Sequence, residues 1–197
     1  MTHQSYPVGI QGQWHQPESV NIPDAHLKNW LMDTGSLTER LQASSHHFAV
    51  EVLGHEVAII APEEAVQLYQ NKPVQETYTP LDQRTQVREV LLKGNHQNWV
   101  FARSLMPQIF IDECMQELGV LGNQPLGKIL FNDARFQRLD FELIQCPLSH
   151  PICEALGMVP KHPLWGRRSL FQFQTHCIMV CEVFLPDSPA YRDMETK

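Results

Sequence analysis

Hydrophobic and polar positions alternate with a period of two over much of the chain, which is typical of β-strands. The clearest case consists of two runs rich in β-branched and aromatic residues, 85–93 and 98–106, which flank a Gly94-Asn95 turn. This arrangement predicts a β-hairpin. Further strands are expected over residues 136–145, 166–174 and 177–185.

Hydrophobic residues at three- and four-residue spacing, typical of helices, occur in short segments. Leu27, Trp30 and Leu31 predict a short amphipathic helix that begins near Pro23. Ser36 starts the sequence SLTE, a capping box, so a second short helix is expected directly after it. Shorter helical stretches are expected over residues 63–69, 110–119, 125–131 and 152–157.

The order of these elements predicts the fold class. Residues 47–60 indicate a hairpin or a pair of strands around Gly54, and residues 62–83 form a long connection. We therefore expect an α+β fold, in which a single, mostly antiparallel sheet of about six strands has short helical flaps covering one face. The first 22 residues are polar and lack a period, so they predict a flexible arm ahead of one domain over 23–192.

Composition narrows the classes of function. The 197 residues are 43% hydrophobic and 19% charged, with a net charge of -7 and scattered basic residues, so a nucleic-acid partner is not expected. No apolar run is long enough to span a membrane and no signal peptide is evident, which favours a cytoplasmic protein. Five cysteines without a secretion signal indicate reduced thiols.

Common catalytic and metal-binding motifs are missing from the sequence. It contains no P-loop, no G-x-G-x-x-G, no G-x-S-x-G and no H-E-x-x-H. The best group of metal-ligating types is Cys146, His150, Cys153 and His162, whose spacing fits no zinc pattern. We therefore predict no metal site.

One carboxylate, Glu182, interrupts an apolar predicted strand. A buried charge requires a partner, and the candidates within strand-like apolar contexts are Arg88, Arg103 and either Arg167 or Arg168. An arginine that Glu182 does not neutralise would be available to grip a carboxylate ligand. Structural ion pairs at the edges of the sheet explain the same pattern equally well.

Several motifs in succession carry a resemblance to a known family. VREVLL is followed by W-x-x-A-R-S-x-x-P, then by LG-x-x-PLGK-x-LF, LWGRRS and CEVFLPDSPAY. Together with the helical segment NWLMDTGSLTERL, this order resembles the bacterial chorismate pyruvate-lyase family over roughly residues 23–192. Each motif alone is weak, but their succession over most of the chain is specific.

The resemblance implies a function. Members of that family cleave chorismate to 4-hydroxybenzoate and pyruvate, the first committed step toward ubiquinone, on an antiparallel sheet whose helical flaps close over a buried site. They use no metal or organic cofactor and hold their product tightly, which gives product inhibition. The relatives act as monomers, whereas the sequence itself leaves the oligomeric state open.

The resemblance also implies roles for single residues. The arginine that binds the ring carboxylate falls on Arg88, and the acid near the ring hydroxyl and ether falls on Glu182. Two flap positions that contact the ligand fall on Leu37, where the family has methionine, and on Leu126. The candidates for contact with a second carboxylate are Arg167, Arg168 and Arg103.

Two questions remain open in the sequence. A carboxyl among apolar neighbours should hold its proton more readily than an exposed one, so Glu182 could donate a proton at neutral pH, yet acid, base and positioner are all compatible with the pattern. The alternative function is a non-catalytic binding or sensor domain for aromatic carboxylates. Regulators that use this fold carry a helix-turn-helix ahead of the sensor, and the polar arm before Pro23 is too short for one.

Overall fold

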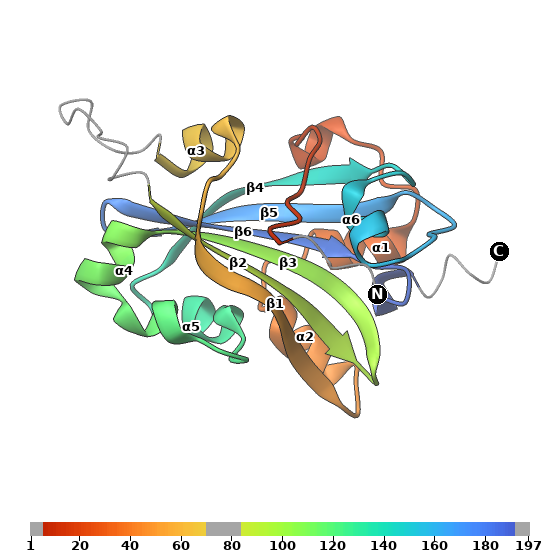
Figure 1. Ribbon diagram of the computed structural model, residues 1–197. Helices are drawn as coiled ribbons and strands as arrows, with labels where there is room; N and C mark the ends of the chain where they lie inside the picture. Colours follow the sequence, from red (N-terminus) through yellow and green to blue (C-terminus); the bar gives the residue numbers. More distant parts are fainter. Residues whose placement is uncertain (1–5, 70–83, 192–197) are drawn as a thin grey trace.

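One open antiparallel sheet forms the centre of the protein (Figure 1). The structure is a computed structural model and describes residues 6–69 and 84–191. Within those residues the sheet has six strands in the order β1-β2-β3-β6-β5-β4. The strands are β1 Phe48–Ala58, β2 Thr85–Gly94, β3 Gln97–Pro107, β4 Gln137–Cys146, β5 Leu164–Phe173 and β6 His176–Phe184. This confirms the predicted α+β class and the single antiparallel sheet.

Two tight turns set the register of the central strands. The β2–β3 turn places Asn95 and His96 at φ values of 51° and 69°, and the β5–β6 turn places Gln174 at 53°. Such left-handed conformations match the twist of hairpin strands. The hairpin predicted around Gly94-Asn95 is confirmed.

The expected hairpin or pair of strands around Gly54 is wrong, because residues 48–58 form one continuous strand. The pairing of β1 with β2 shifts between Val52 and Gly54, so Gly54 marks a β-bulge and not a turn. A Cβ on Gly54 would lie 2.2 Å from a ring atom of Tyr6. The glycine therefore makes room for an aromatic ring from the N-terminal segment.

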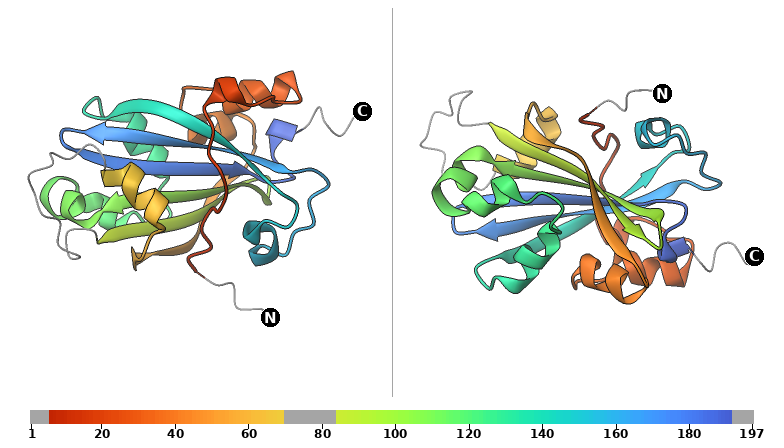
Figure 2. Two further views of the ribbon diagram at one scale, coloured as in Figure 1. Left: turned by 90° about the horizontal axis from the view of Figure 1, so that it is seen from above. Right: turned by 60° about the horizontal axis from the view of Figure 1, so that its bottom comes forward.

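Helices lie on both faces of the sheet (Figure 2). One face carries α1 Ala25–Leu31, α2 Leu37–Ala43, α4 Gln108–Cys114 and α5 Leu126–Asn132, the flaps that the sequence predicts. The opposite face carries α3 Pro62–Tyr69 and α6 Pro151–Ala155. Short 3-10 helices cover Pro17–Ser19 (η1), Gln116–Val120 (η2) and Pro189–Tyr191 (η3).

Local sequence explains where these helices begin and end. Asp24, one residue after the proline that the sequence analysis singles out, caps α1 by accepting from the backbone N–H groups of His26 and Leu27. Ser36 caps α2 as predicted. The single helix expected over 110–119 is wrong: the backbone leaves helical geometry at Met115, with φ -145° and ψ 60°, and divides it into α4 and η2.

The N-terminal segment lies against the sheet face that carries α3 and α6. The backbone N–H groups of Val8 and Gly9 donate to the two carboxylate oxygens of Glu89, at 2.7 and 2.8 Å. His15 forms an isolated antiparallel bridge with Leu143. Residues 6–22, the described part of the predicted arm, thus contact the domain, and the domain limits stay a prediction. The part of the predicted connection over residues 70–83 lies outside the described residues.

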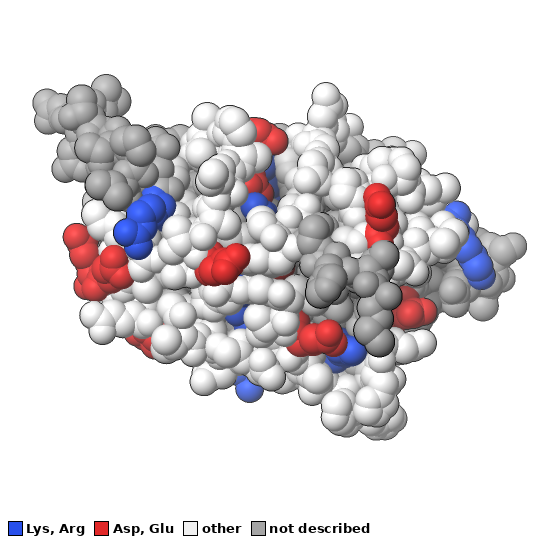
Figure 3. Space-filling view, viewed as in Figure 1, with Lys and Arg blue, Asp and Glu red and all other residues white. Residues whose placement is uncertain are grey.

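The surface and the cysteines add three facts. All five cysteines lie within the described residues, and each is a reduced thiol, as expected. On the face in Figure 3, the Lys and Arg side chains drawn are dispersed among acidic ones. Over residues 6–69 and 84–191, no helix is both long enough and apolar enough to cross a membrane.

Candidate active site

The floor of a cavity is formed by two rows of side chains that cross the four central strands on the face with α2 and α5. Strand register places Arg88, Ser104, Val180 and Ser169 side by side in one row. The next row, two residues along each strand, contains Val90, Ala102, Glu182 and Arg167. Ser104, Ala102 and Val180, which lie in the middle of the rows, have short side chains that leave space above the sheet. The charged side chains of both rows line this space.

Arg88 lies at one end of the first row and is 2% exposed. Its Nη2 donates to the main-chain oxygens of Gly122 and Gln124, at 3.0 and 2.9 Å. Its Nε is buried and has no hydrogen-bond partner within the described residues, and no carboxylate there forms an ion pair with it. Burial lowers the pKa of Arg88 to about 10, so the group stays charged at neutral pH.

Among the described residues, the neighbour of Arg88 across β1 and β2 carries no negative charge. His55 pairs with Arg88 across β1 and β2, so the two side chains lie on the same face. Burial lowers the pKa of His55, and the charge of Arg88 lowers it further. The neutral imidazole of His55 does not compensate the charge of Arg88. The guanidinium of Arg88 is therefore able to bind an anionic ligand.

Glu182 finds its partner in Arg167, the neighbouring residue across β5 and β6. Arg167 Nε donates to Glu182 Oε2 at 2.8 Å, with the two side chains 2% and 17% exposed. Among the arginines that the sequence offers as partners of Glu182, the structure selects Arg167. No described residue donates to Oε1 of Glu182, which is left for a ligand.

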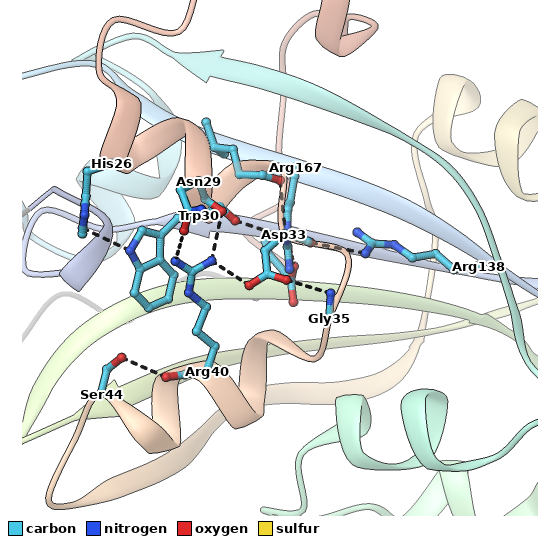
Figure 4. A network of polar contacts seen from close by, with 11 residues as sticks. His26, Asn29, Trp30, Asp33, Gly35, Arg40, Ser44, Arg138 and Arg167 are labelled. Atoms are coloured by element: carbon cyan, nitrogen blue, oxygen red, sulfur yellow. Dashed lines mark hydrogen bonds and ion pairs between the residues drawn. The ribbon is translucent and has the colours of Figure 1, made fainter.

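Arg167 also fixes the loop between α1 and α2. Its Nη1 donates to the main-chain oxygen of Asp33 at 2.6 Å, with longer contacts to those of Trp30 and Leu31 at 3.3 and 3.4 Å. Figure 4 shows this network, in which Arg40 binds the Asp33 carboxylate from the other side. Nε and Nη1 of Arg167 are therefore both occupied within the protein.

The roof of the cavity is formed where α2 and α5 meet. Leu37 and Leu126, the two flap positions of the sequence analysis, are the first residues of these helices; both line the cavity and are buried. The helices touch closely, because a Cβ on Gly127 would lie 2.8 Å from Thr38 Oγ1. The enclosed space is about 40 Å³, room for a few water molecules.

A third arginine, Arg138, lines the cavity from β4, and the sequence analysis did not place it there. Its Nε and Nη2 donate to Ser169 Oγ at 3.1 and 2.8 Å. Simple alternation puts Arg138 on the face opposite Phe141, but the register shifts between these two residues and brings both to the cavity side. In the sequence, Arg138 is a charged residue in a strand with regular alternation. That pattern does not predict the bulge that brings its side chain to the cavity.

Two arginines considered for the site lie on the opposite face of the sheet. Arg103 binds Glu64 and Glu89, at 2.9 and 2.7 Å. Arg168 binds Glu142 at 2.6 Å. Because side chains alternate along a strand, Arg168 must point away from the cavity that Arg167 faces. Neither Arg103 nor Arg168 can contact a ligand in this cavity.

The charges of the cavity do not cancel. Arg88, Arg138 and Arg167 line it together with one carboxylate, Glu182. Three positive charges and one negative charge leave two positive charges in excess among the described lining residues. An organic dianion with an apolar body would balance this charge and fill the space between the rows.

Comparison with known proteins agrees with this geometry. The model of a protein family described as chorismate lyase matches residues 10–195. The chain belongs to the chorismate lyase family. One relative is a protein from Pseudoalteromonas atlantica named "Probable chorismate pyruvate-lyase". It is 40% identical to this chain over 189 residues, which cover 96% of this chain and 94% of the relative. A relative of the same name from Shewanella amazonensis is 35% identical over 195 residues, covering 97% and 96%.

Solved structures support the fold. The chorismate lyase family member resembles the effector domain of PhnF from Mycobacterium smegmatis with a TM-score of 0.52 and 11% sequence identity. The match covers 80% of this chain and 92% of the PhnF domain. At this identity the likeness concerns only the arrangement of strands and helices.

Proposed function

We propose that the protein is a chorismate pyruvate-lyase, which converts chorismate to 4-hydroxybenzoate and pyruvate in the first committed step of ubiquinone synthesis. The observation that carries the proposal is the buried cavity with two positive charges in excess and one carboxylate. Chorismate is a dianion with an apolar ring, so it matches the cavity in charge. Family membership and the names of the relatives support the same reaction.

The reaction requires one bond cleavage and one proton loss on the ring. The bond between the ring carbon and the enolpyruvyl oxygen breaks, and its electron pair leaves with the oxygen. The adjacent, hydroxyl-bearing carbon loses its hydrogen as a proton, which makes the ring aromatic. The departing enolpyruvate gains a proton and becomes pyruvate. Because the atoms and electrons balance within the substrate, we propose that the enzyme works without a cofactor.

Each charged side chain has a role in this proposal. Arg88, with buried donors that lack an anionic partner, binds the ring carboxylate. Glu182, paired with Arg167, accepts a hydrogen bond from the ring hydroxyl and accepts the proton from the neighbouring carbon. Leu37 and Leu126 close the roof and exclude water, which strengthens these electrostatic contacts.

The test follows both products. Purified protein is incubated with chorismate, 4-hydroxybenzoate is detected by its ultraviolet absorbance, and pyruvate is measured by a coupled dehydrogenase. We expect the two products in equal amounts, and a chelator should leave the rate unchanged. Formation of neither product would overturn the proposal and favour the binding-domain alternative, in which the protein retains affinity for aromatic carboxylates without turnover.

Variants separate catalysis from binding. Glu182→Gln should lose at least 100-fold in turnover while keeping affinity for 4-hydroxybenzoate, because removal of a proton-transfer group typically costs 10² to 10⁴ in rate. Arg88→Met should lose both. Arg168→Met is the matched control, since it removes one positive charge beside Arg167 but on the opposite face. Full activity in Glu182→Gln would disprove the assigned role.

A further inference from the structure

Arg138 lines the cavity and has no ion-pair partner among the described residues. Its Nε and Nη2 both donate to Ser169 Oγ, and its Nη1 has only a 3.4 Å contact with the main-chain oxygen of Asp33. No carboxylate in the described parts of the chain forms an ion pair with it. Burial lowers the pKa of Arg138 and the nearby charge of Arg167 lowers it further, and the opposing effects of Glu182 and Asp33 do not offset them.

The side chain is held in one place even without a ligand. The guanidinium carbon lies 5.1 Å from the ring centre of Phe141 and 5.9 Å from that of Phe171. With Ser169 binding one edge of the guanidinium, these rings orient the opposite edge toward Asp33 and Arg167, as Figure 4 shows. A fixed guanidinium with a free edge is suited to two-pronged binding of a carboxylate.

Arg138 lies at the other end of the cavity from Arg88. Ser169, which holds Arg138, is three strands away from Arg88 in the same row of the sheet. At about 4.8 Å for each strand spacing, the two backbones are roughly 14 Å apart, and both side chains reach over the space between. Two guanidinium groups thus border one cavity from opposite sides, with Glu182 between them in the neighbouring row.

Arg167 is less suited to a second carboxylate than Arg138. Its Nε binds Glu182 and its Nη1 binds three main-chain oxygens of the α1 end and the following loop. A ligand that took these donors would leave Glu182 unpaired. Arg138 would give up only one long contact with Asp33.

We propose that Arg138 binds the carboxylate of the three-carbon side chain of the substrate, while Arg88 binds the ring carboxylate. This rests on the proposed function. Arg138 then distinguishes substrate from product, because 4-hydroxybenzoate keeps the ring carboxylate and lacks the second one. Arg167 acts as a positioning residue, which orients Glu182 and the α1–α2 loop.

The experiment compares ligands with one and two carboxylates. Arg138→Met removes the charge and keeps an apolar side chain of similar length, Arg138→Lys restores a charge, and Arg168→Met serves as the matched control. For each protein we would measure kcat and KM for chorismate and, by calorimetry, the Kd of 4-hydroxybenzoate and of 3-(carboxymethoxy)-4-hydroxybenzoate. The last compound has an aromatic ring that cannot react further, and it carries its second carboxylate on an ether, as chorismate does.

In Arg138→Met we expect KM for chorismate and Kd for the dicarboxylate to rise about 10- to 100-fold, the range for a hydrogen-bonded ion pair. The Kd of 4-hydroxybenzoate should change less than about twofold, and Arg138→Lys should recover part of the loss. An equal loss for both aromatic ligands, or no loss for either, would overturn the proposal.

Failure of the proposed function gives a different result. If the parent protein does not convert chorismate but Arg138→Met weakens the dicarboxylate selectively, the lyase proposal fails and the second carboxylate site stands. If chorismate is converted and Arg138→Met is unaffected, the lyase proposal stands and the site fails. Cooperative thermal unfolding well above the assay temperature in both Arg138→Met and Arg168→Met would exclude misfolding as the cause.

Discussion

Arg167 and Glu182 occupy directly paired positions on β5 and β6, and Arg167 Nε donates to Glu182 Oε2 at 2.8 Å. The two residues lie side by side on the cavity face, so the pair is a part of the floor and not an ion pair at the edge of the sheet. The same guanidinium holds the loop after α1. The acid and one wall of the site are therefore positioned by one side chain.

The first prediction concerns the energy of this pair. Arg167→Met leaves Glu182 as a buried charge without a partner, so we expect the free energy of unfolding to fall by about 3 kcal/mol. In the double variant with Glu182→Gln the loss should be smaller than the sum of the two single losses, by about 1 to 3 kcal/mol. Urea denaturation of the four proteins gives the coupling energy. Strict additivity would show that the two side chains do not interact.

The sequence predicts those features of the site that depend on residues close together in the chain. Glu182 is conspicuous because it is charged in an apolar strand, and Arg88 likewise. Local patterns also predict the β2–β3 hairpin and the Ser36 cap, because both depend on neighbouring residues. These features need only the periodicity of a strand or the capping of a helix.

The pairing of charges could not be predicted, because it depends on strand order and on bulges. Arg167 and Arg168 are equivalent in sequence, and only the register of β5 assigns one to each face. Arg138 reaches the cavity through a shift in register that has no signature in its neighbours. Gly54 shows the same limit: a glycine within a strand pattern fits a turn or a bulge, and contact with the distant Tyr6 decides between them.

The second prediction contrasts two buried arginines. Arg88 has no anionic partner among the described residues, so Arg88→Met removes an unpaired buried charge and should change the free energy of unfolding by less than about 1 kcal/mol. Arg103→Met leaves the carboxylates of Glu64 and Glu89 without a cationic partner. It should lower the free energy of unfolding by about 3 to 5 kcal/mol. Denaturant titration of both variants measures the difference. Equal losses would contradict the assignment of Arg88 as a ligand-binding charge.

The third prediction concerns the roof of the cavity. Gly127→Ala places a methyl group 2.8 Å from Thr38 Oγ1, closer than side-chain atoms pack, so the contact between α2 and α5 must change, through rotation of Thr38 or separation of the helices. We expect 4-hydroxybenzoate to dissociate faster in Gly127→Ala, by about tenfold if the opened contact corresponds to about 1.4 kcal/mol of closing energy. Stopped-flow displacement measures the rate.

A second substitution provides the control for the roof. Thr38→Ala removes the oxygen that the new methyl group meets, and the nearest remaining atom of residue 38 is then 3.6 Å away, an ordinary contact. The double variant should recover slow dissociation. If Gly127→Ala alone leaves the rate unchanged, contact between α2 and α5 does not control access to the cavity.

The fourth prediction concerns pH and the loop after α1. Burial opposes ionisation of Asp33, but hydrogen bonds from the Gly35 N–H and from Arg40, with the charges of Arg40 and Arg167, outweigh it and lower the pKa of Asp33 below 3.8. Because the folded pKa lies below the unfolded one, the stabilisation from ionised Asp33 is present above about pH 3.9 and is lost as the pH falls through the folded pKa.

The Gly35 amide reports this titration, since its N–H donates to Asp33 Oδ1 at 2.8 Å. In NMR spectra its proton shift should move with a midpoint below 3.8, and Arg40→Met should raise that midpoint toward the ordinary value by removing the nearest positive charge. Asp33→Asn should abolish the transition. A midpoint in the parent protein at or above 3.8 would mean that burial, and not the two arginines, controls the charge of this loop.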